Sequence, residues 1–325
     1  MHNAESRDLL DGDPPDSDLL DQIKEALDDL STTPWLPGLA ATLVARAQDT
    51  LRRNTGIEDT DYGTARVLAC MLRSPSGTTD SSFGATLGNA GKRLAPRLVM
   101  ASIPLCPTAT DVLPMLIEVL PKDKERTYRV RGLEFHTSDA IDRPAVLGCL
   151  REAVDLLHCV PTLQFTVASL VRVCHLVKPG NDDYDISYSD PQLPFSIFVS
   201  VPRRRQPNGS LRVIESIVHE AMHLQLTLIE RALPLVSGSE SVHFSPWRNE
   251  QRPTRGLLHA LYVFRVIDRF LQELQEHCSQ LVSERSHIAS RRKEICRQFA
   301  EIGVFQDSPS LTPWGSAFAR RLIVP

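Results

Sequence analysis

The sequence has few aromatic residues and lacks the marks of a membrane or secreted protein. Phe, Trp and Tyr make up 6% of its 325 residues. No stretch of about 18 uninterrupted apolar residues occurs, so we expect no membrane-spanning helix. The first run, MHNAESRDLLDGDPPDSD, has neither a basic nor an apolar segment, which argues against a secretory signal. Seven scattered cysteines without a CxxC pair fit neither a disulfide framework nor a zinc knuckle. These absences predict a soluble cytoplasmic protein with free thiols.

Charge is distributed unevenly along the chain. The formal net charge is −4, from 36 basic and 40 acidic residues. Residues 1–34 hold ten acids and two bases and therefore carry −8, which leaves +4 for residues 35–325. A net charge this small gives no general attraction to nucleic acid. Residues 1–34 are expected to form an acidic, partly disordered leader.

Hydrophobic periodicity predicts a mostly helical α+β protein with a small antiparallel sheet before the longest helices. Helical spacing covers 18–30, 36–53, 64–73, 143–158, 212–232, 254–277 and 279–302, and runs typical of strands cover 127–136, 170–178 and 195–202. The small, polar segment 74–92 is the best internal boundary. We expect a helical N-terminal region at 35–125 and a metal-binding catalytic region at 126–325, two regions that can also form one continuous domain.

One motif carries recognisable chemistry. His219-Glu220-Ala221-Met222-His223 is an HExxH sequence inside a strongly helical segment. Residues four apart on a helix differ by about 40° in direction, so both imidazoles point to one side. They can bind one divalent ion there, with Glu220 beside it. Apolar neighbours would bury both rings, and burial of an imidazole without a partner is costly. The motif therefore predicts a metal site rather than two structural histidines.

The third metal ligand decides the chemistry. The longer HExxHxxGxxH motif is absent, and Glu230 lies about 10 Å along the helix from His223, too far to share an ion without a kink. His259 is the better candidate, because it stands in the apolar helix GLLHALYVF, 36 residues after His223. His243, in a predicted loop, is the runner-up.

Arginines accompany His259. Arg252 and Arg255 precede it by seven and four residues, which predicts one shared helix face, with Pro253 opening the helix. The N-terminus of a helix favours an anion, and arginine binds carboxylates in a bidentate manner. The cluster therefore suits the carboxylate of a substrate or cosubstrate. The alternative is that both arginines are surface residues paired with nearby acids.

These residues carry a resemblance to a known family. The runs SIVHEAMHLQLTLIERALPLV and SPWRNEQRPTRGLLHALYVFRVIDRFL resemble the HEXXH-motif peptide-modification proteins, and LTPWGSAFARRL resembles that family's C-terminal tail. Members act on ribosomally made peptide natural products, and those characterised are Fe(II)- and 2-oxoglutarate-dependent β-hydroxylases without a cupin barrel. The resemblance implies that His219, His223 and His259 hold Fe(II). It also implies that Arg252, helped by Arg248 or Arg255, binds the carboxylate of 2-oxoglutarate.

The implied reaction is hydroxylation of an unactivated β-carbon in a peptide or carrier-bound amino acid, with Glu220 orienting a ligand or contacting substrate. The rival hypothesis is a zinc metallopeptidase in which Glu220 is the general base. In either case FSIFVSVP, read as an edge strand, could hold an extended peptide by β-augmentation. A third hypothesis is a non-catalytic module that binds a peptide. The expected partner is a peptide, not nucleic acid or a membrane.

Overall fold

A five-stranded sheet and a group of long helices make up the computed structural model, which describes residues 14–30, 33–54, 99–106, 114–120, 122–130, 132–141, 144–180, 185–190, 195–238 and 241–323. The sheet has the order β1-β2-β3-β5-β4, and a separate ribbon pairs β6 with β7. Strands are β1 (Val99–Ile103), β2 (Met115–Glu118), β3 (Val173–Val177), β4 (Ser187–Ser189), β5 (Ser196–Ser200), β6 (Val242–Ser245) and β7 (Glu250–Pro253).

The helices supply most of the described structure. They are α1 (Ser17–Asp28), α2 (Pro37–Asn54), α6 (Lys122–Val130), α7 (Ser138–Ile141), α8 (Pro144–Asp155), α9 (Pro161–Leu170), α10 (Gly209–Ala232), α11 (Thr254–His277), α12 (Arg285–Ala300) and α13 (Pro313–Ile323), with 3-10 turns η1 (Leu156–Cys159) and η2 (Phe305–Asp307). The predicted α+β class, mostly helical with a small sheet, is confirmed, and no closed barrel forms within the described ranges. None of the helices described is long and apolar enough to cross a membrane.

The sheet is mixed rather than antiparallel. Its outer pairs β1–β2 and β4–β5 are antiparallel, as expected, whereas β2–β3 and β3–β5 are parallel. Helices α6 to α9 form the long crossover between the parallel strands β2 and β3, whereas the parallel strands β3 and β5 are joined through β4. Every residue of β3 and β5 is buried, as in strands covered on both faces.

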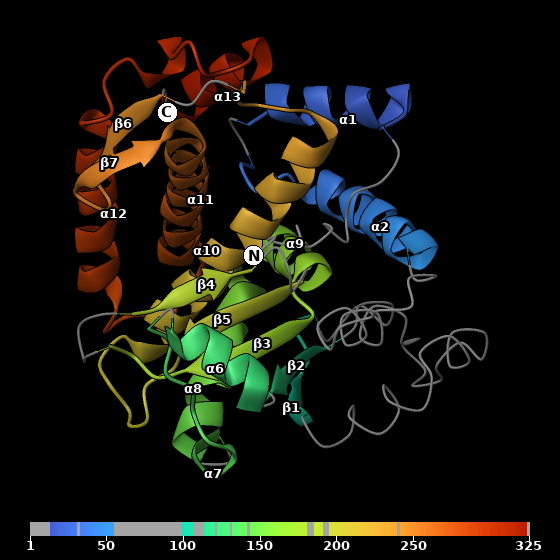
Figure 1. The fold of residues 1–325 in the computed structure, drawn as a ribbon. Helices are drawn as coiled ribbons and strands as arrows, with labels where there is room; N and C mark the ends of the chain where they lie inside the picture. The colour runs from blue at the N-terminus through green and yellow to red at the C-terminus, as the bar shows by residue number, and fades with distance from the viewer. Residues whose placement is uncertain are drawn as a thin grey trace.

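Alternation along β5 divides the core between the two faces of the sheet. Ile197 and Val199 belong to the main core, which also holds the apolar face of α10. Phe198, between them, belongs to a smaller core with Tyr128 of α6 and Phe135. Figure 1 shows α6 in front of the sheet, and α10 contacts β4 and β5 from the other side. The sheet thereby fixes one flank of α10, the helix that carries the HExxH motif.

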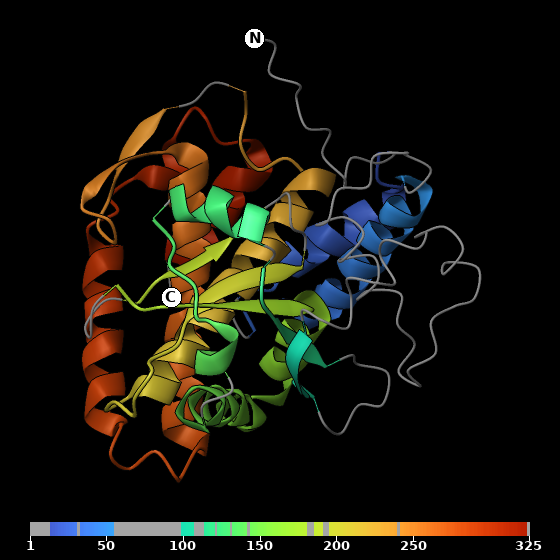
Figure 2. The same ribbon diagram turned by 60° about the horizontal axis from the view of Figure 1, so that its bottom comes forward.

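Helices α10 and α11 form the centre of the helical part. Buried side chains join them: the Tyr262 hydroxyl donates to Oε1 of Gln225 at 2.7 Å, and Nε2 of Gln225 donates to the Leu36 carbonyl at 3.2 Å. Helix α12 packs along α11, on the side away from α1 and α2 in both views (Figures 1 and 2). Helix α13 closes the far end, where a Cβ at Gly315 would overlap the carbonyl oxygen of Leu235.

The acidic helix α1 is part of this fold. Its buried residues Leu19, Ile23 and Leu27 belong to the main core, and Asp28 pairs with Arg321 of α13. The amine of Lys24 lies 5.9 Å from the ring centroid of Trp314, also in α13. The expected leader therefore has a folded part from residue 17 onward. The predicted disorder of residues 1–13, the helix at 64–73 and the boundary at 74–92 lie outside the described residues.

Several expected elements agree with the structure, and two expectations about strands are wrong. The helix predicted at 254–277 has these bounds, and those predicted at 212–232 and 143–158 correspond to α10 and to α8 with η1. The strand predicted at 127–136 is wrong: its first half is helix α6, and only Phe135 makes an isolated bridge, to Val177. The segment FSIFVSVP contains β5, which lies between β3 and β4, so it is not an edge strand. The six described cysteines are free, as expected.

Candidate functional site

Three histidines meet between α10 and α11. His219 and His223 project from the same face of α10, and their Nε2 atoms lie 3.1 Å apart. His259 reaches toward them from α11, with its Nδ1 3.0 Å from Nδ1 of His223. The expected candidates therefore contact one another, although His259 lies 36 residues after His223.

The three rings form a row rather than a ring of ligands. His223 directs one nitrogen at His219 and the other at His259, and its ring lies nearly parallel to that of His259, at 19°. Among the residues that the structure describes, these three histidines are not a group in which one nitrogen from each ring lies within 4.8 Å of the other two nitrogens. Two nitrogens bound to one ion at about 2.1 Å are at most about 4.2 Å apart. In this arrangement the pair His219–His223 satisfies that limit, and His259 touches the opposite edge of the His223 ring.

Glu230 orients His259. Its Oε2 lies 2.9 Å from Nε2 of His259 and 3.1 Å from Nε of Arg255. Glu230 lies seven residues beyond His223 on α10, and α11 brings His259 to it. With Nε2 donating to a carboxylate, the unprotonated nitrogen of His259 is Nδ1, which faces His223. A carboxylate behind a histidine in this way fixes the tautomer and raises the basicity of a metal ligand. Sequence reasoning missed this role.

The electrostatic surroundings keep His219 and His223 neutral. Burial, followed by the charges of Arg291, Arg248 and Arg252, lowers the pKa of His219 to about 4. Burial also holds the pKa of His223 well below its ordinary value, with added effects from its histidine neighbours. A neutral imidazole keeps a lone pair for a cation. The His219 side chain is nevertheless 25% exposed and that of His259 12%, so a small ligand can approach them.

Glu220 lies on the sheet side of the site. Its side chain is 4% exposed, and its Oε1 lies 4.0 Å from Nε2 of His219. Burial raises the pKa of Glu220 to about 7, against the opposing effect of hydrogen bonds from Ser187 and Ser189 of β4. A carboxyl group with that pKa can hold or release a proton near neutral pH. Glu220 is thus the acid–base group nearest to His219 and His223.

The three predicted arginines stand at different places. Arg252 belongs to β7 and not to the helix, so the expectation that it shares a helix face with Arg255 and His259 is wrong. The β6–β7 ribbon delivers it to the start of α11: a Cβ at Gly256 would lie 3.3 Å from Nε of Arg252. Among the described residues, the ion pair of Arg252 is a loose one with Glu250 at 4.0 Å, and its side chain is 32% exposed. Arg248 is exposed in the turn of the ribbon, and its charge acts on His219, His223 and Glu220.

Aromatic rings form one wall beside His219. The rings of Trp247 and Phe264 stack at 4.9 Å, and Phe264 meets the His219 ring edge-on at 5.6 Å. The guanidinium of Arg291, from α12, lies 5.6 Å from the Phe264 ring and donates to Glu215. Arg291 is one of the charges that depress the pKa of His219.

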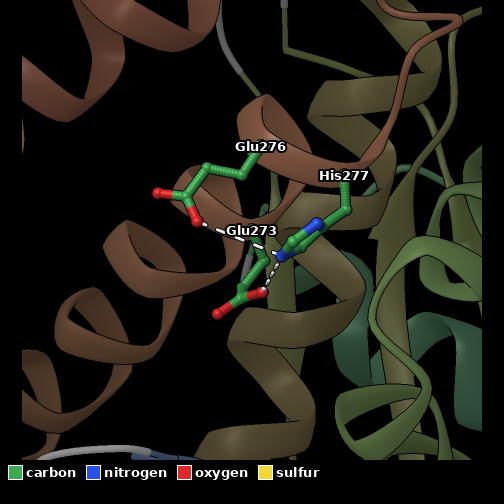
Figure 3. A group of neighbouring side chains, drawn as sticks. All are labelled: Glu273, Glu276 and His277. Carbon is green, nitrogen blue, oxygen red and sulfur yellow. Dashed lines mark ion pairs between the residues drawn. The ribbon is translucent and has the colours of Figure 1, made fainter.

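Other histidines are engaged elsewhere. His243, the runner-up ligand, lies in β6 with its Nε2 3.1 Å from both the Thr254 and Ser308 hydroxyls. On α11, Glu273, Glu276 and His277 do have ligand atoms within 4.8 Å of one another (Figure 3). That group lies at the surface. Glu273 also pairs with Arg269 at 2.6 Å, so the charge of Glu273 is already compensated. The candidate site remains the three histidines with Glu220, Glu230 and Arg252.

Comparison of the chain with protein-family models and with curated proteins finds no match. The function is therefore inferred from the three-histidine site and from the HExxH motif and its neighbouring residues.

Proposed function

We propose that the protein is a non-heme Fe(II)- and 2-oxoglutarate-dependent oxygenase that hydroxylates a β-carbon in a peptide or carrier-bound amino acid. The observation that carries the proposal is the orientation of His259 by Glu230, which turns its Nδ1 toward His223 of the HExxH motif. A histidine that binds a metal commonly has such a carboxylate on its other nitrogen.

The donor set fits an iron(II) ion. His219 and His223 would bind through their Nε2 atoms, whose 3.1 Å separation is within reach of one ion. His259, whose Nδ1 lies 3.0 Å from Nδ1 of His223, would be the third ligand. Three neutral imidazoles leave other coordination positions for a bidentate cosubstrate, and the bound ion would supply the redox chemistry.

Arg252 supports 2-oxoglutarate as the cosubstrate. Its guanidinium lies against Gly256, in the first turn of α11, and within the described part of the chain its carboxylate partner is Glu250, at 4.0 Å. A guanidinium without a close acid is suited to a carboxylate ligand, which it binds through two parallel hydrogen bonds. Arg248 would add to the positive potential from the turn of the ribbon. Arg255 is the weaker candidate, because it already pairs with Glu230.

Within this proposal the protein residues have separate tasks. Glu220 holds a proton on the sheet side of His219, at a pKa of about 7. Phe264 and Trp247 limit the access of water on the opposite side. Glu230 maintains the tautomer of His259.

The second candidate is a zinc metallopeptidase, and the state of Glu220 favours it. A buried carboxylate 4.0 Å from a motif histidine is placed to take a proton from a water that attacks a peptide bond. Zinc binds histidine as readily as iron does, so ligand type does not separate the two candidates. Arg252 favours the oxygenase, because its guanidinium is suited to the carboxylate of a cosubstrate. A non-catalytic peptide-binding module is the third candidate, and it gives no role to the acid–base group Glu220.

An anaerobic titration of metal-free protein with Fe(II) and 2-oxoglutarate tests the proposal. We expect a visible charge-transfer band that requires both components and is lost in His259→Ala. His243→Ala is the matched control, because His243 contacts Thr254, Ser308 and Phe305, and its loss should leave the band unchanged. Absence of the band, together with tight zinc binding and peptide cleavage that Glu220→Gln abolishes, would establish the metallopeptidase instead.

A further inference from the structure

The β6–β7 ribbon has an open edge. The amide of Thr254 donates to the carbonyl of Ser241 at 3.0 Å, which makes Ser241–Thr254 a hydrogen-bonded pair. Since such pairs alternate in an antiparallel ladder, the pairs Val242–Pro253 and Phe244–Gln251 are the non-hydrogen-bonded ones. Proline opposite Val242 agrees, because it has no N–H to donate.

It follows that the backbone groups of Val242 and Phe244 point away from β7. Among the residues that the structure describes, neither makes a backbone hydrogen bond outside the ribbon. Their side chains are unusually exposed for apolar residues, at 65% and 42%. Soluble proteins usually protect a strand edge with charge or cover it, so an edge with exposed apolar side chains indicates a partner.

A groove runs beside this edge. A cavity of about 330 Å³ separates β6 from the segment that follows α12, with Phe244, Ile302, Val304 and Phe305 among its apolar lining residues. Val304 is 73% exposed. Two acids, Glu301 and Asp307, also line it. Glu301 is paired with Arg297, whereas no ion pair of Asp307 occurs among the described residues.

We propose that this edge and groove bind an extended peptide that carries apolar and basic side chains. The peptide would add a third strand to the ribbon through the outward N–H and C=O groups of Val242 and Phe244. Its apolar side chains would pack against Phe244 and Val304, and its basic side chains would approach Asp307. The other strand of the same ribbon carries Arg252, so the bound peptide lies on the element that reaches the histidine site.

This inference rests on the proposed function in one respect, namely that the substrate is a peptide. Binding is therefore measured on the full, metal-free chain, where a failure of iron or 2-oxoglutarate chemistry has no effect. The probe is a fluorescein-labelled peptide of alternating valine and arginine, followed by fluorescence anisotropy. Two further versions are N-methylated on every second residue and on all residues.

We expect the half-methylated peptide to bind like the parent, because it keeps one hydrogen-bonding edge, and the fully methylated peptide to lose about tenfold or more in affinity. Val304→Ser should weaken binding about tenfold. Val282→Ser is the matched control, since Val282 is 71% exposed and does not line the groove. Asp307→Asn should weaken the valine–arginine peptide but not a valine–threonine peptide.

Three results would overturn the proposal. One is equal binding of the half- and fully methylated peptides, which would show docking by side chains alone. Another is unchanged affinity in Val304→Ser. The third is a result in which none of the peptides binds and the protein forms a dimer that Val304→Ser dissociates. A second copy of this chain would then occupy the edge.

Discussion

The protein contains two sets of buried or half-buried histidines that differ in what their nitrogens face. In the sheet region, Nε2 of His136 lies 2.8 Å from the Val201 carbonyl, and Nδ1 of His175 lies 3.2 Å from that of Glu118. Between α10 and α11, the nitrogens of His223 face two other imidazoles. Burial is common to both sets. A backbone carbonyl faces one nitrogen of each histidine in the first set, whereas both nitrogens of His223 face other imidazoles, and each such contact needs either an N–H hydrogen or a cation between the two nitrogens.

The largest effect should come from the motif histidines. His219→Ala or His223→Ala should reduce the affinity for Fe(II) or Zn(II) by more than about 100-fold. Loss of a residue that only hydrogen-bonds a metal ligand typically costs about 10-fold to 100-fold. His136→Gln should retain the metal, as should Glu273→Gln in the surface cluster of α11. Metal content after dialysis, measured by inductively coupled plasma mass spectrometry, provides the test. If both alanine variants retained the metal, the histidines between α10 and α11 would not differ from those of the sheet region in metal binding.

Arg252→Ala should raise the 2-oxoglutarate concentration needed for the charge-transfer band by about 10–100-fold, since a hydrogen bond to a charged group contributes about 1.5–3 kcal/mol. Iron affinity should change little. Arg269→Ala, on α11 but paired with Glu273, is the control. An unchanged requirement in Arg252→Ala would assign the carboxylate to another residue.

Glu230→Gln should weaken metal binding by about 10-fold to 100-fold, because an amide does not enforce the His259 tautomer as a carboxylate does. Arg255→Ala keeps the carboxylate and loses only an ion pair whose arginine is 63% exposed, so its effect should be much smaller. Isothermal titration with Zn(II) compares the two. Equal losses would mean that the ion pair, and not the tautomer, is what matters.

The smallest effect concerns His136. Burial lowers the pKa of His136, which outweighs its hydrogen bond to Val201, and the charges of Arg203 and Lys178 act in the same direction. The native protein then binds fewer protons than the unfolded chain below about pH 6.5, so this group makes stability fall as the pH drops below that value. His136→Gln should show a shallower loss of stability between pH 7.5 and 5.5, measured by urea unfolding. A parallel loss in both proteins would contradict the pKa shift.

Sequence alone predicted the parts of the fold that periodicity controls. The spacing of apolar residues in 254–277 identified α11, and the HExxH spacing placed His219 and His223 on one face of α10. Strands were less accessible, because short buried runs such as MLIE in β2 have no distinctive period. The alternation of apolar and polar residues in 127–136 predicted a strand, but its first residues belong to α6. Tyr128 provides the apolar contact of α6 with the smaller core, and most of the other residues of α6 are charged, so no helical apolar pattern is visible.

The site was predicted only as far as local spacing reaches. His259 was identified from its apolar surroundings, and it does contact His223. The role of Glu230 could not be predicted, because it depends on how α11 crosses α10 rather than on distance along one helix. Arg252 was assigned to a helix, yet the ribbon brings it to the first turn of α11. The positions of Glu230 and Arg252 relative to the histidines thus depend on tertiary packing, which the motif does not specify.

The contact between α1 and α13 has a consequence for synthesis. Asp28 and Arg321 are 293 residues apart, so at 5–20 residues per second a ribosome needs about 15–60 s to produce the partner of α1. Throughout that time the apolar side of α1 lacks one of its packing surfaces. A nascent chain of this length is therefore a natural client for chaperones that hold amphipathic helices until translation reaches the last helix.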